Sequence, residues 1–159
     1  MSVKIISVGK LKEKYLKQGI EEYAKRLKPY TKFEIIELVD EATNENASDK
    51  ENEAVKAKEG DRILKQIKTD DYVFELAIKG KMVTSEELAE KIRQEKIYTS
   101  GNIVFVIGGS LGTSKAVSQR ADAHISFGKV TYPHQLMRLI LTEQIYRAYR
   151  IMSGHSYHK

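Results

Sequence analysis

The stretch that most constrains the fold is the apolar run Ile103–Ile107, which leads directly into the loop Gly108-Gly109-Ser110-Leu111-Gly112. A run rich in β-branched residues, with no polar alternation, predicts a strand buried on both faces. Such strands belong to parallel sheets, where ligands bind at the carboxyl ends of the strands. Glycines at that point let the backbone come close to a bound molecule. The sequence therefore predicts an α/β fold in which this loop is either a small-molecule site or a plain strand-to-helix turn.

The common phosphate-binding loops do not fit this spacing. A dinucleotide fingerprint needs a glycine at the third place of the loop, where this chain has Ser110. A P-loop needs Gly-Lys followed by Ser or Thr, and that sequence is absent here. The simpler alternative is a turn in which Ser110, Thr113 or Ser114 caps the next helix.

Length and composition predict a single domain, residues 1–159, with a core large enough to be stable without disulfide bonds or structural metal ions. The chain has no cysteine, which excludes a disulfide framework, a thiolate metal site and a cysteine nucleophile. Its first apolar run, Val3–Val8, is too short for a signal peptide or a membrane span. We therefore expect a soluble, cytoplasmic protein without a membrane partner.

Charge is unevenly distributed along the chain, whose net value is +5. Residues 33–61 carry three Lys or Arg against ten acids, whereas residues 103–159 carry seven against two. An acid-poor region around the glycine loop favours a polyanionic partner such as nucleic acid. The alternative is ordinary solvated lysine faces on helices.

Strand and helix patterns alternate throughout, which predicts one α/β domain with a mostly parallel sheet and helices on both faces. Strands are expected over residues 3–8, 33–39, 72–78, 103–107 and 123–127. Helices are expected over 12–28, after the caps Ser48 and Thr84, over 114–121 and from Pro133 to a left-handed cap at Gly154. Lys79-Gly80-Lys81 is expected to form a basic turn, and Gly60 to weaken its helix.

The last helix has an apolar surface wider than one sheet face can cover. One stripe is extended sideways by Leu136, Leu139 and Ile140. The helix is therefore either a fully enclosed core helix or packed against a second copy of the protein.

The first turns of that helix carry His134 and Arg138, whose spacing of four residues places them on one face. The amino terminus of a helix disfavours an imidazolium, so His134 is expected to stay neutral and able to accept a proton. Arg138 beside it has the geometry to hold a phosphate. The alternative for His134 is an ordinary histidine in a capping region.

Several short segments, taken in order, closely resemble one group of bacterial enzymes. These are Val8-Gly9-Lys10-Leu11-Lys12, Gly108-Gly109-Ser110, Phe127-Gly128-Lys129, Pro133-His134-Gln135, Glu143-Gln144-Ile145-Tyr146-Arg147-Ala148 and Tyr157-His158-Lys159. The group is the small ribosomal RNA large-subunit methyltransferases of the SPOUT, or α/β-knot, class, which methylate N3 of a pseudouridine in 23S rRNA. The resemblance covers essentially the whole chain.

The resemblance implies a trefoil-knotted carboxy-terminal half, a homodimer packed through the last helix, and no metal ion. It also implies S-adenosylmethionine bound in a bent form by backbone groups of three loops. On this chain those loops contain Leu76, Gly108, Phe127, Gly128, Lys129, Val130, Thr131 and Tyr132. A knot is not expected from the strand and helix pattern alone, because true knots are very rare.

Methylation of an imide nitrogen requires loss of its proton, which needs a base or groups that stabilise the deprotonated ring. The candidates for this role are His134 and, from the end of the chain, Tyr157 and His158. Arg138 and Lys159 are expected to hold phosphates or developing negative charge. The resemblance suggests that the last residues reach the cofactor loop of a partner subunit, whereas terminal residues are otherwise often disordered.

RNA contacts are expected from aromatic and basic residues. Tyr132 or Tyr157 is a candidate for stacking on the target base. The candidate contacts to the RNA backbone are Lys79, Lys81, Lys115, Arg120 and Lys129. The assembled ribosome is the favoured substrate. The alternatives are a knotted methyltransferase acting on another RNA such as tRNA, a ribosome-binding protein without catalysis, and a flavodoxin-like nucleotide-binding protein.

Overall fold

Strands and helices alternate along residues 1–159, all of which are described by the computed structural model. The elements are β1 (Ser2–Val8), α1 (Lys14–Leu27), β2 (Lys32–Leu38), α2 (Asp49–Leu64), β3 (Tyr72–Met82), α3 (Ser85–Tyr98), β4 (Ile103–Ile107), α4 (Lys115–Arg120), β5 (Ala123–Ser126) and α5 (His134–Met152). This order confirms the alternation predicted from the sequence.

The five strands form one sheet in the order β2-β1-β4-β3-β5, and every neighbouring pair is parallel. Ile103 of β4 pairs with Val3 on one side and with Tyr72 on the other. All residues of β4 are at most 4% exposed, as expected for a central strand with both faces covered. The trefoil knot implied by the resemblance stays a prediction.

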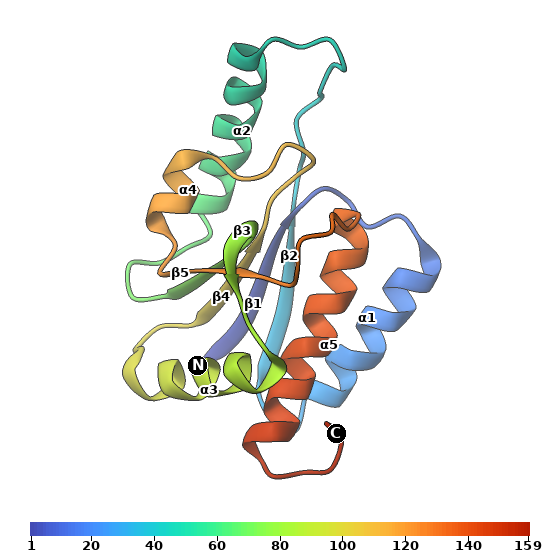
Figure 1. The fold of residues 1–159 in the computed structure, drawn as a ribbon, viewed down its shortest axis with the longest axis vertical. Coiled ribbons are helices and arrows are strands. Elements are labelled where there is room, and N and C mark those ends of the chain that lie inside the picture. Colours follow the sequence, from blue (N-terminus) through green and yellow to red (C-terminus); the bar gives the residue numbers. More distant parts are fainter.

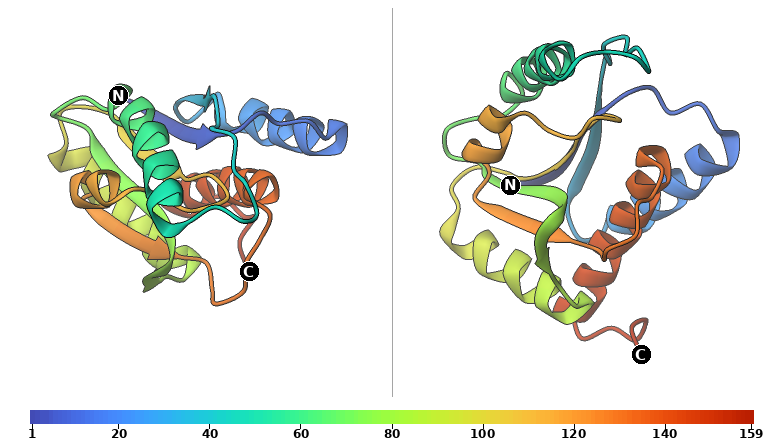
Figure 2. Two further views of the ribbon diagram at one scale, coloured as in Figure 1. Left: turned by 90° about the horizontal axis from the view of Figure 1, so that it is seen from above. Right: turned by 45° about the horizontal axis from the view of Figure 1, so that its top comes forward.

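Helices cover both faces of the sheet, as predicted (Figure 1). α1, α3 and α5 lie on one face, and α2 and α4 lie on the other, as the right view of Figure 2 also shows. The larger core joins the first face to α3 and α5 around the stacked rings of Phe74 and Phe105, whose centroids are 4.7 Å apart. A smaller core of mainly valine and isoleucine side chains lies under α2 and α4.

The helix caps lie where the sequence predicts them, except that the last helix begins one residue later. Ser48 and Thr84 each accept a hydrogen bond from the backbone N–H three residues later, and Ser114 does the same at the start of α4. Pro133 is the cap of α5 rather than its first helical residue, so the helix begins at His134. Gly154 has a φ of +68°, which confirms the left-handed turn after α5.

The predicted turn at Lys79-Gly80-Lys81 is wrong, because β3 continues through it to Met82. β3 pairs with β5 twice, first over residues 74–76 and again over residues 81–82, with an irregularity between Leu76 and Lys81. A Cβ on Gly80 would lie 2.8 Å from the backbone of His124 and Ile125. Gly80 therefore permits a close approach of β3 to β5, and does not mark a turn.

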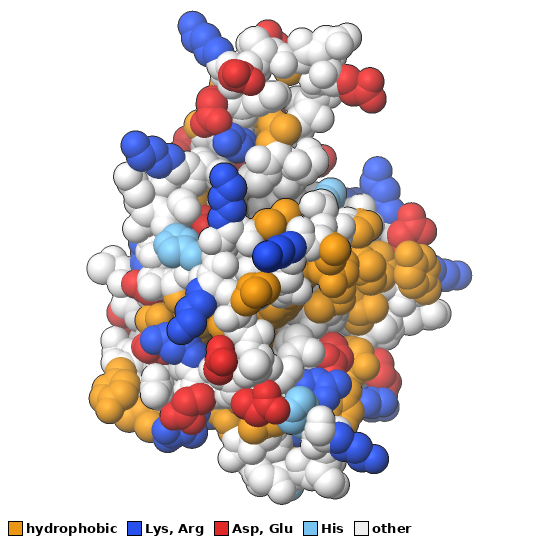
Figure 3. Space-filling view, viewed as in Figure 1, with side chains coloured by type: hydrophobic (Ala, Val, Ile, Leu, Met, Phe, Trp, Pro, Cys, Tyr) orange, Lys and Arg blue, Asp and Glu red, His pale blue; other side chains and the backbone are white.

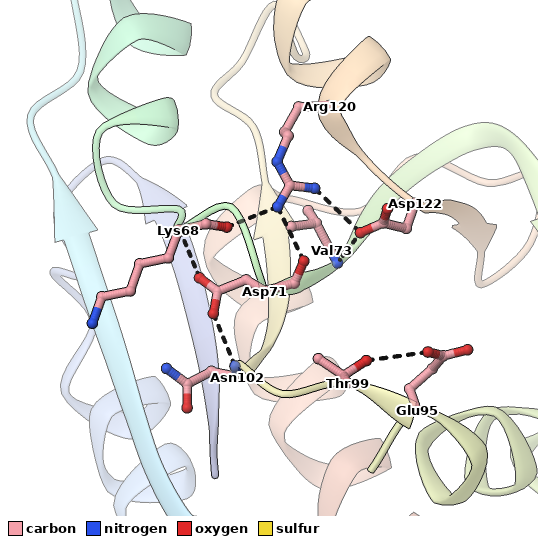
Figure 4. Close-up of polar contacts among 8 residues, drawn as sticks. All are labelled: Lys68, Asp71, Val73, Glu95, Thr99, Asn102, Arg120 and Asp122. Carbon is pink, nitrogen blue, oxygen red and sulfur yellow. Dashed lines mark hydrogen bonds and ion pairs between the residues drawn. The ribbon is translucent and has the colours of Figure 1, made fainter. Parts of the chain in front are cut away.

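The edge of the sheet at which the parallel strands begin, its amino-terminal edge, is held by a dense polar network (Figure 4). The Asp71 carboxylate accepts hydrogen bonds of 2.8 Å from the N–H groups of Lys68 and Asn102. Asp122 accepts one of 2.8 Å from the N–H of Val73, and Arg120 donates to the carbonyls of Lys68 and Asp71. The network joins the starts of β3, β4 and β5.

α5 is partly enclosed and partly free. Leu141 and Ile145 are fully buried against the sheet. Leu136 and Leu139 pack against α1, where Gly19 leaves room for Leu139, since a Cβ there would lie 3.0 Å from that side chain. Part of the sideways apolar surface is therefore covered by α1. No helix in the structure is long and apolar enough to span a bilayer.

Candidate functional site

A large cavity, about 1100 Å³, lies at the carboxyl ends of β4, β3 and β5. It is the position predicted from the strand Ile103–Ile107 and its glycine loop. The walls come from the end of β3, from the loop 108–113 and from the loop 126–134. The sheet thus brings together two loops that are separated in the sequence by α4 and β5.

Seven of the eight residues predicted to bind the cofactor line this cavity: Leu76, Gly108, Phe127, Gly128, Val130, Thr131 and Tyr132. The exception is Lys129, an exposed residue that is absent from the wall. Apolar side chains from Ile107, Leu111 and Met137 add to the lining. A cavity with an apolar floor and exposed loop backbone suits a flat aromatic ring held by main-chain hydrogen bonds.

Two glycines of the wall adopt backbone conformations that other residues avoid. Gly112 has a φ of +88° and Gly128 a φ of +122°, and a Cβ on either would meet no atom within 4 Å. Gly108 is crowded instead, because a Cβ there would lie 2.8 Å from the carbonyl carbon of Gly112. The loop 108–112 therefore closes on itself, and its backbone and that of Gly128 border the cavity without side chains in between.

The loop 108–114 also packs against α2. A Cβ on Gly60 would overlap Ser114 Oγ, and one on Gly109 would lie 2.9 Å from Glu59 Oε1. Glu59 is 5% exposed, and its burial raises the pKa of its carboxyl. Gly60, expected only to weaken the helix, is the position where α2 meets the cap of α4.

A buried carboxylate in the wall was missed by sequence reasoning. Glu75 of β3 is 2% exposed and accepts hydrogen bonds from Thr113 Oγ1 at 2.6 Å and Ser118 Oγ at 3.0 Å. His124 Nδ1 lies 2.9 Å from the same carboxylate. Glu75 thus joins β3, the glycine loop, α4 and β5. The available signal was a single acidic residue within the apolar run 72–78.

His134 lines the cavity from the first position of α5. Its imidazole faces Gly9, where a Cβ would lie 3.4 Å from His134 Nε2. Gly9 has a φ of +101°, so the turn after β1 leaves space for the ring. The predicted candidate base is therefore in the cavity wall.

Arg138 is not available for the predicted phosphate contact, because its side chain is 1% exposed and outside the cavity wall. It donates to Glu37 Oε2 at 2.5 Å and to the carbonyl of Gly9 at 3.0 Å. Partial burial raises the pKa of Glu37, but hydrogen bonds from Leu11 N–H and Arg138 outweigh it and hold that pKa below its usual value. A buried guanidinium needs such partners. The common face predicted for His134 and Arg138 is confirmed, since both lie against Gly9.

The last residues of the chain lie away from the large cavity of the same chain. Tyr157, His158 and Lys159 are not among its lining residues. The carboxyl end instead lies beside the far end of α5 (Figure 1). A role for these residues in catalysis stays a prediction.

Two lysines reach the cavity, Lys56 of α2 and Lys79 of β3. Of the basic residues expected to contact RNA, Lys81, Lys115 and Lys129 are exposed. Arg120 is bound into the network at the opposite edge of the sheet, so it is not placed to contact RNA at this site.

A smaller cavity of about 350 Å³ adjoins the large one. The two share Ser126, Phe127, Gly128 and Tyr132. Its other wall comes from the start of α3 and from Ile140 and Gln144 of α5.

Comparison with known proteins gives a consistent result. Residues 1–158 match the family model described as predicted SPOUT methyltransferase. Proteins named "Ribosomal RNA large subunit methyltransferase H" are similar over the full length of both chains, at 60% identity in Limosilactobacillus reuteri, 58% in Enterococcus faecalis and 57% in Bacillus pumilus.

A solved structure shares the fold. The probable methylase family protein from Haemophilus influenzae superposes with a TM-score of 0.51 at 12% sequence identity. The match covers 99% of this chain and 70% of that one.

Proposed function

Because the chain belongs to the SPOUT methyltransferase family, we propose that it transfers a methyl group from S-adenosylmethionine to N3 of a pseudouridine in 23S rRNA. The observation that carries the proposal is the cavity in which the loops 108–113 and 126–134 meet beside His134. The names of the relatives, which refer to large-subunit rRNA, support the substrate class.

The cavity fits S-adenosylmethionine in size and lining. Leu76, Ile107 and Phe127 offer apolar surface for an adenine ring. The exposed backbone at Gly108 and Gly128 offers donors and acceptors for polar groups of the cofactor. When bound, S-adenosylmethionine supplies an electrophilic methyl group on a sulfonium. The residues of this chain provide orientation and exclude water, which accounts for much of the rate in such a reaction.

Removal of the imide proton falls to His134 in this proposal. Its ring lies in the cavity wall at the amino end of α5, and an imidazole nitrogen there is the proposed proton acceptor. Arg138 and Glu37 then act indirectly, because they fix the Gly9 turn against which the ring lies. Tyr132, which lines both cavities, is the residue proposed to stack on the target base.

We propose a homodimer formed through the amino-terminal half of α5. Figure 3 shows hydrophobic side chains gathered over the region where α5 and α1 begin. Leu136 and Leu139 there are only partly buried, and Tyr15 of α1 is 66% exposed. Such a patch is typical of an interface. Sedimentation of the wild type and of Leu136→Lys tests it: a monomeric wild type would contradict the dimer.

The substrate is proposed to be the assembled ribosome, since a domain of this size offers little surface for gripping flexible RNA. The test has two steps. Calorimetry measures S-adenosylmethionine binding, and methyl transfer is then compared on ribosomes, free subunits, naked 23S rRNA and tRNA, with mass spectrometry locating the product. Transfer to ribosomes supports the proposal. Transfer only to tRNA, or cofactor binding without transfer to any RNA, contradicts it and favours a different knotted methyltransferase or a non-catalytic binding protein.

A further inference from the structure

The last residues of the chain are docked on α5 rather than free. After Met152 the chain reverses at Gly154, and Arg150 donates to the carbonyl of Ser156 at 2.8 Å. Arg150 also donates to Tyr30 Oη at 2.9 Å, and that hydroxyl lies 2.7 Å from His155 Nδ1. The turn that leads to Tyr157 is therefore fixed by groups from α5 and from the segment after α1.

Tyr157 occupies a seat made by a charged pair on α5, Glu143 and Arg147. The guanidinium carbon of Arg147 lies 4.7 Å from the centre of the Tyr157 ring, and the Tyr157 hydroxyl donates to Glu143 Oε1 at 3.3 Å. Arg147 donates to the same carboxylate oxygen at 2.9 and 2.7 Å. Tyr146 meets the ring edge-on at 4.9 Å. The Tyr157 side chain is therefore held both by polar contacts with Glu143 and Arg147 and by an aromatic contact with Tyr146.

The seat also orients His158. Arg147 Nη1 lies 3.1 Å from His158 Nδ1, and His158 Nε2 lies 2.5 Å from Glu86 Oε1. Arginine can only donate hydrogen bonds, so this contact is favourable only when Nδ1 carries a lone pair. The proton of the ring is then on Nε2, where it is donated to Glu86. Arg147 and Glu86 therefore select both the position and the tautomer of His158.

The seat residues are next in sequence to residues that line the smaller cavity. Ser85 and Gln144 line that cavity and are joined by a hydrogen bond of 2.7 Å. Glu86 follows Ser85, and Glu143 precedes Gln144. Glu143 and Glu86 contact Tyr157 and His158 of the carboxy-terminal tail, residues 157–159. The smaller cavity in turn shares a wall with the large one, so the residues that hold the tail adjoin in sequence a cavity next to the proposed cofactor site.

The polar contacts of the seat are not what holds α5 in place. Leu141 and Ile145, both 0% exposed, anchor the helix in the core. The Arg147–Glu143 pair, with side chains 24% and 16% exposed, lies at the margin of that core, where solvent still reaches both partners. A role in stability therefore does not explain why so many contacts converge on the last residues.

We propose that Glu143 and Arg147 are positioning residues, which hold Tyr157 and His158 in the geometry that methyl transfer requires. This inference rests on the proposed function of the chain. It holds whether the seated tail serves its own cavity or that of a partner subunit, because the seat and the tail belong to the same chain.

Arg147→Met tests the seat, since it keeps an unbranched apolar stem and removes the guanidinium donors. We expect unchanged S-adenosylmethionine affinity and a fall in turnover of about 100-fold, as for a misplaced catalytic group. Carboxypeptidase should release the last residues faster than from the wild type. Arg147→Lys keeps the charge and should recover part of the turnover. The matched control is Arg93→Met, which breaks an exposed pair with Glu90 on α3 and should change neither readout.

A double variant separates positioning from direct action. Arg147→Met combined with deletion of 157–159 should be no slower than the deletion alone, because the seat acts only through the tail. Turnover of Arg147→Met equal to wild type, or a double variant much slower than the deletion, would overturn the inference. If the wild type neither binds the cofactor nor methylates RNA, the proposed function fails instead, and the carboxypeptidase comparison still tests the seat.

Discussion

The two edges of the sheet are built in opposite ways. At the amino-terminal edge, Asp71, Asp122 and Arg120 satisfy backbone groups at the starts of β3 and β4 at distances of 2.8–3.0 Å. At the carboxyl edge, the strands end in loops with glycines at positive φ and in a cavity of about 1100 Å³. One edge uses its polar groups to fix the chain, and the other leaves backbone accessible to a ligand.

We therefore expect stability and the proposed cofactor binding to depend on opposite ends of the same strands. β3 and β4 begin in the polar network and end at the cavity, only a few residues later. Substitutions at the first edge should therefore change folding without changing affinity, and substitutions at the second should do the reverse. The predictions below test that separation.

Asp71→Ala should have the largest effect on stability. Asp71 is 5% exposed, and its carboxylate accepts hydrogen bonds from two backbone N–H groups. Both N–H groups would lose their partner in the variant. We expect the free energy of unfolding to fall by about 3–5 kcal/mol. Urea denaturation measures this loss, and calorimetry on the folded fraction should give wild-type cofactor affinity. A tenfold weaker affinity would show that the two edges are coupled.

Gly60→Ala tests the contact between α2 and the glycine loop. Helix propensity alone predicts a gain of about 1 kcal/mol. The new Cβ would instead overlap Ser114 Oγ and lie 3.0 Å from Ser114 Cβ, and this serine is fixed as the cap of α4. We expect a net loss of about 1–3 kcal/mol in urea denaturation. A stabilised variant would show that the loop yields easily.

Gly128→Val should affect binding more than folding. A β-branched residue at a φ of +122° is strained by about 1–2 kcal/mol, and its side chain extends from the cavity wall into open space. We expect S-adenosylmethionine to bind at least about tenfold more weakly in calorimetry, with a small shift in the unfolding midpoint. Unchanged affinity would remove Gly128 from the proposed cofactor site.

The smallest expected effect concerns the tail at high pH. Burial, followed by the neighbouring Tyr23 and Glu143, raises the pKa of Tyr157 from 10.0 to about 12. A raised pKa means that docking favours the neutral phenol, so the tail's stabilisation is complete below pH 10 and is lost as pH rises through about 12. The difference between absorbance titrations of the wild type and Tyr157→Phe at 295 nm measures the pKa of Tyr157. A midpoint of this difference near pH 10 would contradict the docked ring.

The sequence predicted the parallel sheet, both helical layers and most of the cavity wall, because each follows from a local pattern. β4 is uniformly apolar, and the loops after it and after β5 carry the glycines that the cavity needs. β3 was predicted too short, since a close crossing at Gly80 and a turn have the same composition. The spacing of strands along the chain does not reveal such a crossing.

The polar partners were the part that local patterns could not predict. Arg138 was expected to hold a phosphate, but Glu37, a hundred residues earlier in β2, neutralises it. Glu75 was overlooked for the same reason, since its partners Thr113 and His124 come from other elements. Side-chain pairing over such distances depends on strand order, which the sequence alone does not specify.

The strand order has a consequence for how this chain is made. β4 lies between β1 and β3, yet it is the fourth of the five strands to be synthesised, so β1 is paired only with the edge strand β2 until residues 103–107 emerge. The central pairing of the sheet joins residues a hundred positions apart, and such non-local pairing is slow to form. Formation of the core therefore awaits synthesis beyond residue 107 of 159, and a ribosome stalled before β4 would hold a nascent protein without its core.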